Sequence, residues 1–151
     1  STAWTSSSAG RNTPRMERRF PRRMARCAAS MSTLHRFPKA KLGLGHLGET
    51  LPFLLWRFDS RAGPDFYNVP LKKPPSHYIK QNLYVTTSGM CSAEPLNCTI
   101  AALGHERIMF GADYPFERAE EAGHWFDNEK LDEKARADIA HGNAERLLGL
   151  K

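Results

Sequence analysis

The sequence predicts an α/β fold with a parallel sheet, because strand-like and helix-like segments alternate along the chain. Three short apolar runs have the composition of strands, at residues 41–45, 82–87 and 107–110. Helical patterns follow each run, which gives three strand–helix units and no further internal repeat. Polar residues come where the first and third strands should end, which is where catalytic groups lie in barrels of alternating strands and helices.

The first unit pairs a glycine-thinned strand at residues 41–45 with a helix expected over residues 49–61. The apolar side chains of this helix fall on one stripe, which consists of Leu51, Leu54, Leu55 and Phe58. Gly-Pro and Pro-Pro pairs within residues 62–75 then indicate a loop. The predicted helix therefore packs through one face and ends before this loop.

The second unit begins with one or two helical turns at residues 76–81 and a strand at residues 82–87. The strand is rich in β-branched and aromatic residues, as strands prefer. A helix is expected over residues 94–103, and Gly104 follows it as the residue that closes the helix.

The third unit has its strand at residues 107–110 and a helix expected over residues 131–141. The expected buried positions of this helix are Leu131, Ala135 and Ile139. We expect Gly142 to end this helix and Asn143 to cap a last short helix that runs through Leu148.

Positive charge is concentrated in the first quarter of the chain. The 151 residues have a formal net charge of +6, yet residues 1–38 hold eight arginines against Glu17, which gives +7. Residues 39–151 hold 14 Lys or Arg against 15 Asp or Glu, which gives −1. A nucleic-acid-binding protein needs a basic face on its folded part. The sequence therefore predicts no nucleic-acid partner.

Residues 1–36 are expected to lie apart from the folded domain at residues 37–151. They are rich in Ser and Arg and show no hydrophobic periodicity. A disordered tail, an organelle transit peptide and a mis-predicted segment read from the wrong frame are the alternatives. The tail has no continuous apolar stretch, so it does not resemble a secretory signal.

Membrane insertion and disulfide bonding are not expected. No apolar run approaches the ~20 residues that cross a bilayer. The spacing of the three cysteines matches no CxxC metal pattern. We expect Cys91 and Cys98 to be small buried side chains of a reduced, cytoplasmic protein. Trp56 and Trp125 are expected to anchor packing.

His46 and Glu49 are three residues apart at the end of the first strand. If the helix starts near Gly48, the two side chains share a face. A Glu bonded to one ring nitrogen raises the basicity of the imidazole and leaves the other nitrogen free to exchange a proton. The alternative is that Glu49 stabilises the helix start by its charge while His46 is an ordinary loop residue.

Asp113 follows the third strand and precedes Tyr114-Pro115. Its carboxylate could bind a metal or accept a proton, or it could be a turn residue. Arg57 could bind a substrate carboxylate through both guanidinium nitrogens, or it could form a surface ion pair with Asp59 or Glu49.

Five stretches of the chain resemble the carboxyl-terminal part of the amidohydrolase-related superfamily, and its dihydroxybenzoate (γ-resorcylate type) decarboxylases in particular. The stretches are RFP at 36–38, LGHLGETLPFLLWRFDSR at 44–61, YVTTSG at 84–89, RIMFGADYPFE at 107–117 and GNAERLL at 142–148. Their order and identity together favour a functional role for His46, Glu49 and Asp113.

The resemblance implies about the last three strand–helix units of a (β/α)8 TIM-like barrel, with residues 37–151 as the carboxyl-terminal portion of that domain. It implies a divalent metal, zinc or manganese, with Asp113 as a ligand and the pair His46–Glu49 as acid–base machinery beside it. The expected activity is non-oxidative decarboxylation of a small hydroxylated aromatic acid by an enzyme that forms homo-oligomers. Arg57 and Phe116 are expected at the pocket wall or at a subunit interface.

The chain also departs from the family pattern, because no E-x-H or H-x-H motif for further metal ligands occurs in it. One Asp and one His do not fill the three protein positions of a catalytic zinc. We therefore expect this chain alone to bind metal weakly and to be inactive, or to need a partner. The two other hypotheses are a metal-dependent hydrolase of the wider superfamily and an inactive truncated fragment.

Overall fold

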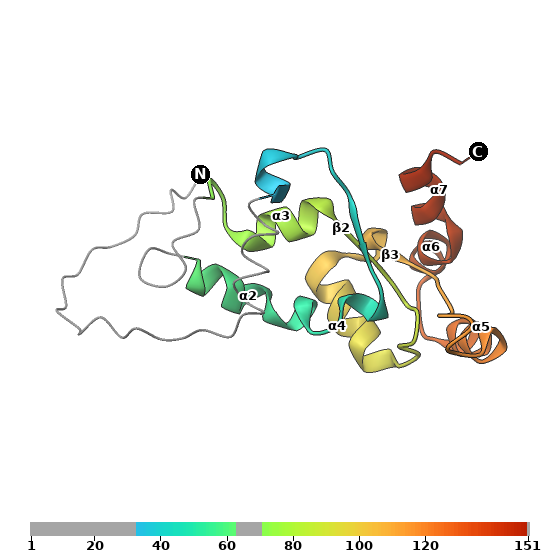
Figure 1. Cartoon of the computed structure of the whole chain (residues 1–151). Coiled ribbons are helices and arrows are strands. Elements are labelled where there is room, and N and C mark those ends of the chain that lie inside the picture. The colour runs from blue at the N-terminus through green and yellow to red at the C-terminus, as the bar shows by residue number, and fades with distance from the viewer. Residues whose placement is uncertain (1–32, 63–70, 151) are drawn as a thin grey trace.

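The computed structural model describes residues 33–62 and 71–150, and its centre is one parallel sheet (Figure 1). The strands are β1 (Leu42–Leu44), β2 (Leu83–Thr86) and β3 (Ile108–Met109), in the order β1-β2-β3. Both pairings are parallel, as the alternation of strands and helices predicts. The α/β prediction is therefore confirmed, although β3 is shorter than expected.

Helices connect the strands and follow the last one. They are α2 (Leu51–Arg61), α3 (Pro75–Asn82), α4 (Ala93–Leu103), α5 (Ala119–Asn128), α6 (Glu133–Ala137) and α7 (Asn143–Leu148). Short turns complete the described chain, namely η1 (His46–Gly48), η2 (His105–Arg107) and the π-helical η3 (Asp138–Gly142). In Figure 1 the helices α2, α3 and α4 lie on one side of the strands and α5 to α7 lie on the other.

The core lies between the sheet and the helices that connect its strands. Val85 on β2 is in register with Leu44 on β1 and with Ile108 on β3, and Val85 and Ile108 are fully buried. Laterally paired residues in a sheet point to the same face. Leu55 of α2 and Leu96 of α4 belong to the same buried cluster. The helical stripe predicted from the sequence thus contributes Leu55 to the core, with Leu51 and Phe58 packed against it.

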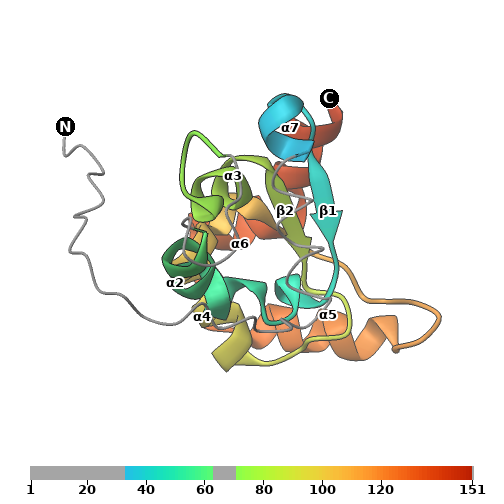
Figure 2. The same ribbon diagram turned by 60° about the vertical axis from the view of Figure 1, so that its left-hand side comes forward.

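Strand β1 forms an open edge of the sheet. All three of its residues are exposed, and Leu42 and Leu44 keep 43% and 37% of their surface accessible. Figure 2 shows β1 beside β2, the strand with which it pairs. An unpaired strand edge carries free N–H and C=O groups that can pair with another strand. This edge is therefore a place where further strands can be added.

A buried asparagine anchors the chain that leads into β1. Asn82 is fully buried, and its Nδ2 donates to the carbonyls of Pro38 at 2.9 Å and Ala40 at 2.7 Å. Just before this segment, residues 33–36 form a helical turn, and Leu34 belongs to the buried cluster. The remainder of the segment predicted as a tail, residues 1–32, lies outside the described residues.

A second asparagine corrects the prediction for the last helix. Asn143 does not cap α7 through its side chain. It is 1% exposed, and its Nδ2 donates to the carbonyls of His105 at 2.8 Å and Ile108 at 2.6 Å. Gly142 does not end the preceding helix either, because α6, η3 and α7 run on with helical backbone angles. The glycine is tolerated inside the helical run, and the asparagine serves tertiary contact rather than capping.

The third unit differs from the prediction at its start as well. Leu131 lies ahead of α6, whose first turn is capped by the Asp132 carboxylate accepting from the N–H of Ala135 at 2.8 Å. The expected burial of Ala135 and Ile139 is confirmed. The sequence analysis also missed α5, in which only Ala122 and Phe126 are buried.

Three side chains expected to be buried are on the surface. Cys91 and Cys98 are both exposed free thiols, and Trp56 is 77% exposed. Trp125, by contrast, packs against the buried cluster as expected. Within the described residues, no helix has the length and apolar character needed to span a bilayer.

Candidate active site at the carboxyl ends of the strands

The turn after β1 presents His46 and Glu49 in an unusual backbone conformation. Positive φ angles occur at His46 (52°), Leu47 (51°), Gly48 (81°) and Glu49 (55°). Residues other than glycine rarely adopt positive φ angles, and backbone strain of this kind is found at functional sites. Leu47 anchors the turn, since it is 1% exposed and its carbonyl accepts from Thr99 Oγ1 at 3.2 Å.

This turn corrects one premise of the sequence interpretation. The helix α2 begins at Leu51, so Glu49 lies before it and not on its first turn. The i, i+3 spacing still brings the two side chains together, because the backbone folds back in η1. The N–H of Glu49 donates to the carbonyl of His46 at 2.9 Å, which closes the turn.

Asp113 follows β3 in a second strained turn. Its φ is 71°, and its carbonyl accepts from the N–H groups of Phe116 at 2.9 Å and Glu117 at 3.1 Å. The peptide bond between Tyr114 and Pro115, within this turn, is cis. These bonds close a turn that begins at Asp113, four residues after the end of β3.

The buried hydroxyl of Thr87 joins the ends of β2 and β3. Thr87 Oγ1 donates to the carbonyl of Gly111 at 2.9 Å and accepts from the N–H of Gly111 at 3.0 Å. These two bonds fix the position of Gly111, two residues before Asp113. No spacing in the sequence identifies this contact, because it joins residues 24 positions apart.

His46 lies between the two carboxylates. Its Nδ1 is 3.0 Å from Glu49 Oε1, and its Nε2 is 3.4 Å from Asp113 Oδ2. The side chains are partly open to solvent, with 42% of His46 and 30% of Asp113 exposed. The structure thus brings together all three residues that the sequence selected for catalysis, from the ends of β1 and β3.

The two carboxylates favour the charged imidazolium. The hydrogen bond to Glu49 is the largest cause that raises the pKa of His46 above its ordinary value, and the bond to Asp113 is the second. Both ring nitrogens donate when the ring is protonated. His46 therefore keeps its proton to a higher pH than an ordinary histidine, as a group that transfers a proton to a bound molecule can.

The described residues do not complete a metal site. Over residues 33–62 and 71–150, no three His, Cys, Asp or Glu side chains are arranged to hold a metal ion. Asp113 offers one carboxylate, and the Nε2 of His46 already faces it. A catalytic zinc takes three protein ligands, so this set is too small by itself.

Arg57 and Phe116 are not brought into this cluster. Both are exposed, Phe116 at 86%, and in the described part of the chain the side chain of neither residue contacts the side chains of His46, Glu49 or Asp113 through a hydrogen bond or ion pair. The alternative that Arg57 pairs with Asp59 is not seen, because Asp59 Oδ2 instead accepts from the hydroxyl of Ser76 at 2.6 Å.

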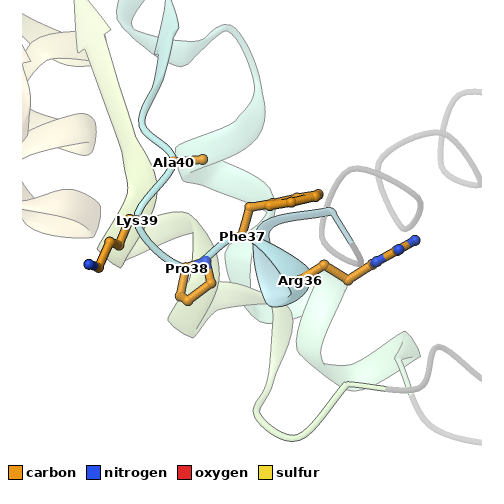
Figure 3. A pocket seen from close by; sticks show the side chains of 5 residues that line it. All are labelled: Arg36, Phe37, Pro38, Lys39 and Ala40. Atoms are coloured by element: carbon orange, nitrogen blue, oxygen red, sulfur yellow. The ribbon is translucent and has the colours of Figure 1, made fainter.

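A shallow pocket of about 600 Å³ lies elsewhere, along residues 36–40 (Figure 3). These residues precede β1, whereas His46 follows it, so the pocket and the cluster are at opposite ends of the strand. The side chains of Arg36 and Lys39 point in different directions in Figure 3 and do not converge on one ligand. The strand ends are therefore the better candidate site.

The fold and the site together define an α/β domain with ionisable side chains at the carboxyl ends of its parallel strands. The chain belongs to the amidohydrolase family (Amidohydro_2), whose profile matches residues 23–150. The resemblance read from the five stretches is thereby confirmed.

Several similar proteins are decarboxylases. The chain is 38% identical over 120 residues to γ-resorcylate decarboxylase from Polaromonas sp. JS666, a match that covers 76% of this chain and 36% of that protein. It is 37% identical over 117 residues to the decarboxylase orsB of Emericella nidulans, with 75% and 35% covered. The chain thus spans little more than a third of the length of these relatives.

Solved structures of decarboxylases are also similar to this chain. The dihydroxybenzoic acid decarboxylase of Polaromonas sp. JS666, with bound manganese and the inhibitor 2-nitroresorcinol, gives a TM-score of 0.76 at 34% identity. That match covers 84% of this chain and 40% of the solved chain. The 5-carboxyvanillate decarboxylase of Sphingomonas paucimobilis gives 0.78 at 36% identity, with 84% and 38% covered.

Proposed function

We propose that this chain forms one side of the active site of a metal-dependent, non-oxidative decarboxylase of small hydroxylated aromatic acids. The observation that carries the proposal is the imidazole of His46 held between the Glu49 and Asp113 carboxylates at the strand ends. The family and the names of the relatives support this reaction class, since they act on γ-resorcylate, dihydroxybenzoate and 5-carboxyvanillate.

We further propose that the described chain corresponds to the last three strand–helix units of a (β/α)8 barrel. The three parallel strands and the open edge of β1 support this, as does the coverage of only 36–40% of the relatives' length. A barrel closes both edges of such a sheet. The remaining units would complete the mouth around the strand ends.

In this proposal His46, Glu49 and Asp113 together bind and transfer one proton. The Glu49 carboxylate stabilises protonated His46 through Nδ1. The proton on Nε2 of His46 is then transferred to Asp113 or to the bound aromatic substrate. Delivery of that proton to the ring carbon bearing the carboxylate forms a C–H bond. The bond to the carboxylate then breaks, CO₂ leaves with no change in oxidation state of the protein, and aromaticity returns.

A divalent metal, manganese or zinc, would hold the substrate's carboxylate and hydroxyl oxygens. Manganese is present in one similar structure, and Asp113 is the ligand that we propose from this chain. The further ligands would come from outside the described residues. Arg57 and Phe116 stay predictions for the substrate wall or a subunit contact, and homo-oligomer formation and cytoplasmic location also stay predictions.

The test compares the 151-residue chain with a hybrid that carries the missing barrel units. In the hybrid, residues 37–150 of this chain replace the matching carboxyl-terminal segment of the Polaromonas γ-resorcylate decarboxylase. CO₂ release from dihydroxybenzoates is measured with added Mn²⁺. We expect turnover by the hybrid and none by the chain alone.

The variants Asp113→Asn and His46→Asn should each abolish turnover in the hybrid, whereas Asp127→Asn on α5 should leave it unchanged. A folded hybrid that hydrolyses amides or lactones but releases no CO₂ would instead support the hydrolase hypothesis. Robust decarboxylation by the isolated chain would contradict the proposal that its site is incomplete.

A further inference from the structure

Gly89 lies against the contact between His46 and Asp113. It occupies the turn after β2, where the N–H of Met90 donates to the carbonyl of Thr87 at 3.0 Å. A Cβ atom built at Gly89 would lie 3.0 Å from Asp113 Oδ2, 3.0 Å from His46 Cδ2 and 3.3 Å from His46 Nε2. The backbone of Gly89 is thus close to the two atoms whose approach makes the acid–base pair.

We infer that Gly89 is a positioning residue, whose missing side chain leaves the space in which the imidazole of His46 and the carboxylate of Asp113 approach each other. This inference rests on the proposed function of that pair. It goes beyond that function by placing the end of β2, and not only the ends of β1 and β3, in the control of the site geometry.

The two neighbours have little freedom to move away. His46 is bonded to Glu49 on its far nitrogen, and the next residue, Leu47, is fixed in the core. Asp113 lies in a turn closed by two backbone hydrogen bonds. The Nε2–Oδ2 distance is already 3.4 Å, so a shift of a few tenths of an ångström breaks the hydrogen bond.

Gly89 also has a φ of 62°, in the left-handed region. Any L-residue at this position is strained, whether or not the space above it is filled. A test must therefore separate backbone strain from the steric effect on His46 and Asp113. Gly149 offers the matched control, because its φ is 67° and no atom would lie within 4 Å of an added Cβ.

The experiment uses the metal-free 151-residue chain and its variants Gly89→Ala and Gly149→Ala. NMR spectra record the ring ¹⁵N and ¹H signals of His46 at one fixed pH. We expect Gly89→Ala to shift the Nε2 signal, because the contact with Asp113 lengthens, while Gly149→Ala leaves both ring nitrogens unchanged. An unaltered His46 ring in folded Gly89→Ala would overturn the inference.

A double-mutant cycle gives the second readout. The urea midpoint is measured for Gly89→Ala with and without His46→Ala. Removal of the imidazole relieves the steric conflict, so the loss of midpoint caused by Gly89→Ala should become smaller. Backbone strain alone predicts an equal loss in both backgrounds, which would contradict the inference.

If Gly89→Ala alone does not fold, the inference requires that the double variant Gly89→Ala with His46→Ala does fold. Failure of both variants to fold would also overturn the inference. None of these measurements needs turnover. A negative result here leaves the decarboxylase proposal intact, and an inactive hybrid leaves this test valid.

Discussion

His46 is the residue on which the proposed chemistry depends, and its ionisation can be measured directly. Glu49→Gln removes the stronger of the two carboxylate hydrogen bonds that raise its pKa. We expect the pKa of His46 to fall toward its ordinary value, and by more than in Asp113→Asn. The measurement is an NMR titration of the His46 ring proton in the metal-free chain.

The sign of the effect on stability follows from the raised pKa. The folded state binds the proton more tightly than the unfolded state, so the stabilisation is complete below the ordinary pKa of 6.5 and is lost as pH rises through the folded pKa. Glu133→Gln on α6 is the control for the NMR titration, because Glu133 is exposed and not among the causes of the raised pKa of His46. A larger change in Asp113→Asn than in Glu49→Gln would contradict the expected order of the two contacts.

The sequence could predict one half of this cluster and not the other. His46 and Glu49 are only three positions apart, so a contact between their side chains could be expected from the sequence. Their pairing through a turn of positive φ could not, because only one of the four residues in it is a glycine. The contact of His46 with Asp113 joins residues 67 positions apart. It depends on strand order, and the resemblance supplied what the spacing lacked.

Among the elements, α7 is tied to β3 by a single buried side chain. Asn143→Ala removes the donor from a buried hydrogen bond with the carbonyl of Ile108 and from a partly buried one with the carbonyl of His105. We expect a loss of about 2–4 kcal/mol in the free energy of unfolding, since each unsatisfied buried group costs about 1–3 kcal/mol. Urea denaturation measures it. Asn128→Ala, at an exposed position, should cost no more than about 0.5 kcal/mol.

The joint between α6 and α7 depends on a charged cluster around Asp138. Lys134 Nζ lies 2.7 Å from Oδ2, and Arg146 Nη2 lies 2.7 Å from Oδ1. The hydrogen bond from Lys134 and then that from Arg146 hold the pKa of Asp138 well below its ordinary value of 3.8. This carboxylate therefore stays ionised in the folded protein to a lower pH than an ordinary aspartate does.

The consequence is a pH-dependent stability. A lowered folded pKa gives stabilisation that is complete above the unfolded pKa of 3.8 and is lost as pH falls toward the folded pKa. Asp138→Asn should therefore lower the urea midpoint near neutral pH, and the gap from the unchanged chain should narrow below about pH 4. A gap that is constant with pH would refute this account. Asp127→Asn serves as the exposed control.

At the scale of elements, the sequence predicted best where burial is strongest. Leu83 and Val85 on β2 are buried and belong to an apolar run that could be recognised as a strand. The helix α5 could not be recognised, because only Ala122 and Phe126 of its ten residues are buried. An asparagine such as Asn143 suits both a helix cap and a buried tertiary contact. Only its tertiary partners distinguish them.

For the whole molecule, the proposed place of this chain in a barrel would explain both the open edge of β1 and the small number of metal ligands among the described residues. The chain matches 36–40% of its relatives' length, and three strands are too few to close a barrel. Leu42 and Leu44 are apolar yet exposed at this edge, which favours contact with further strands. Completion of the sheet and completion of the metal site would then occur together.

Metal affinity is the property that separates a complete site from a partial one. In calorimetric titrations the isolated chain should show no saturable Mn²⁺ binding at micromolar concentration, and Asp113→Asn should change nothing there. In the hybrid defined above, Mn²⁺ should bind, and Asp113→Asn should weaken binding by more than about tenfold, the lower bound typical of losing even an outer-shell partner. Tight binding by the isolated chain that depends on Asp113 would show that its own residues suffice. Equal binding in the hybrid with and without the substitution would remove Asp113 from the proposed ligands.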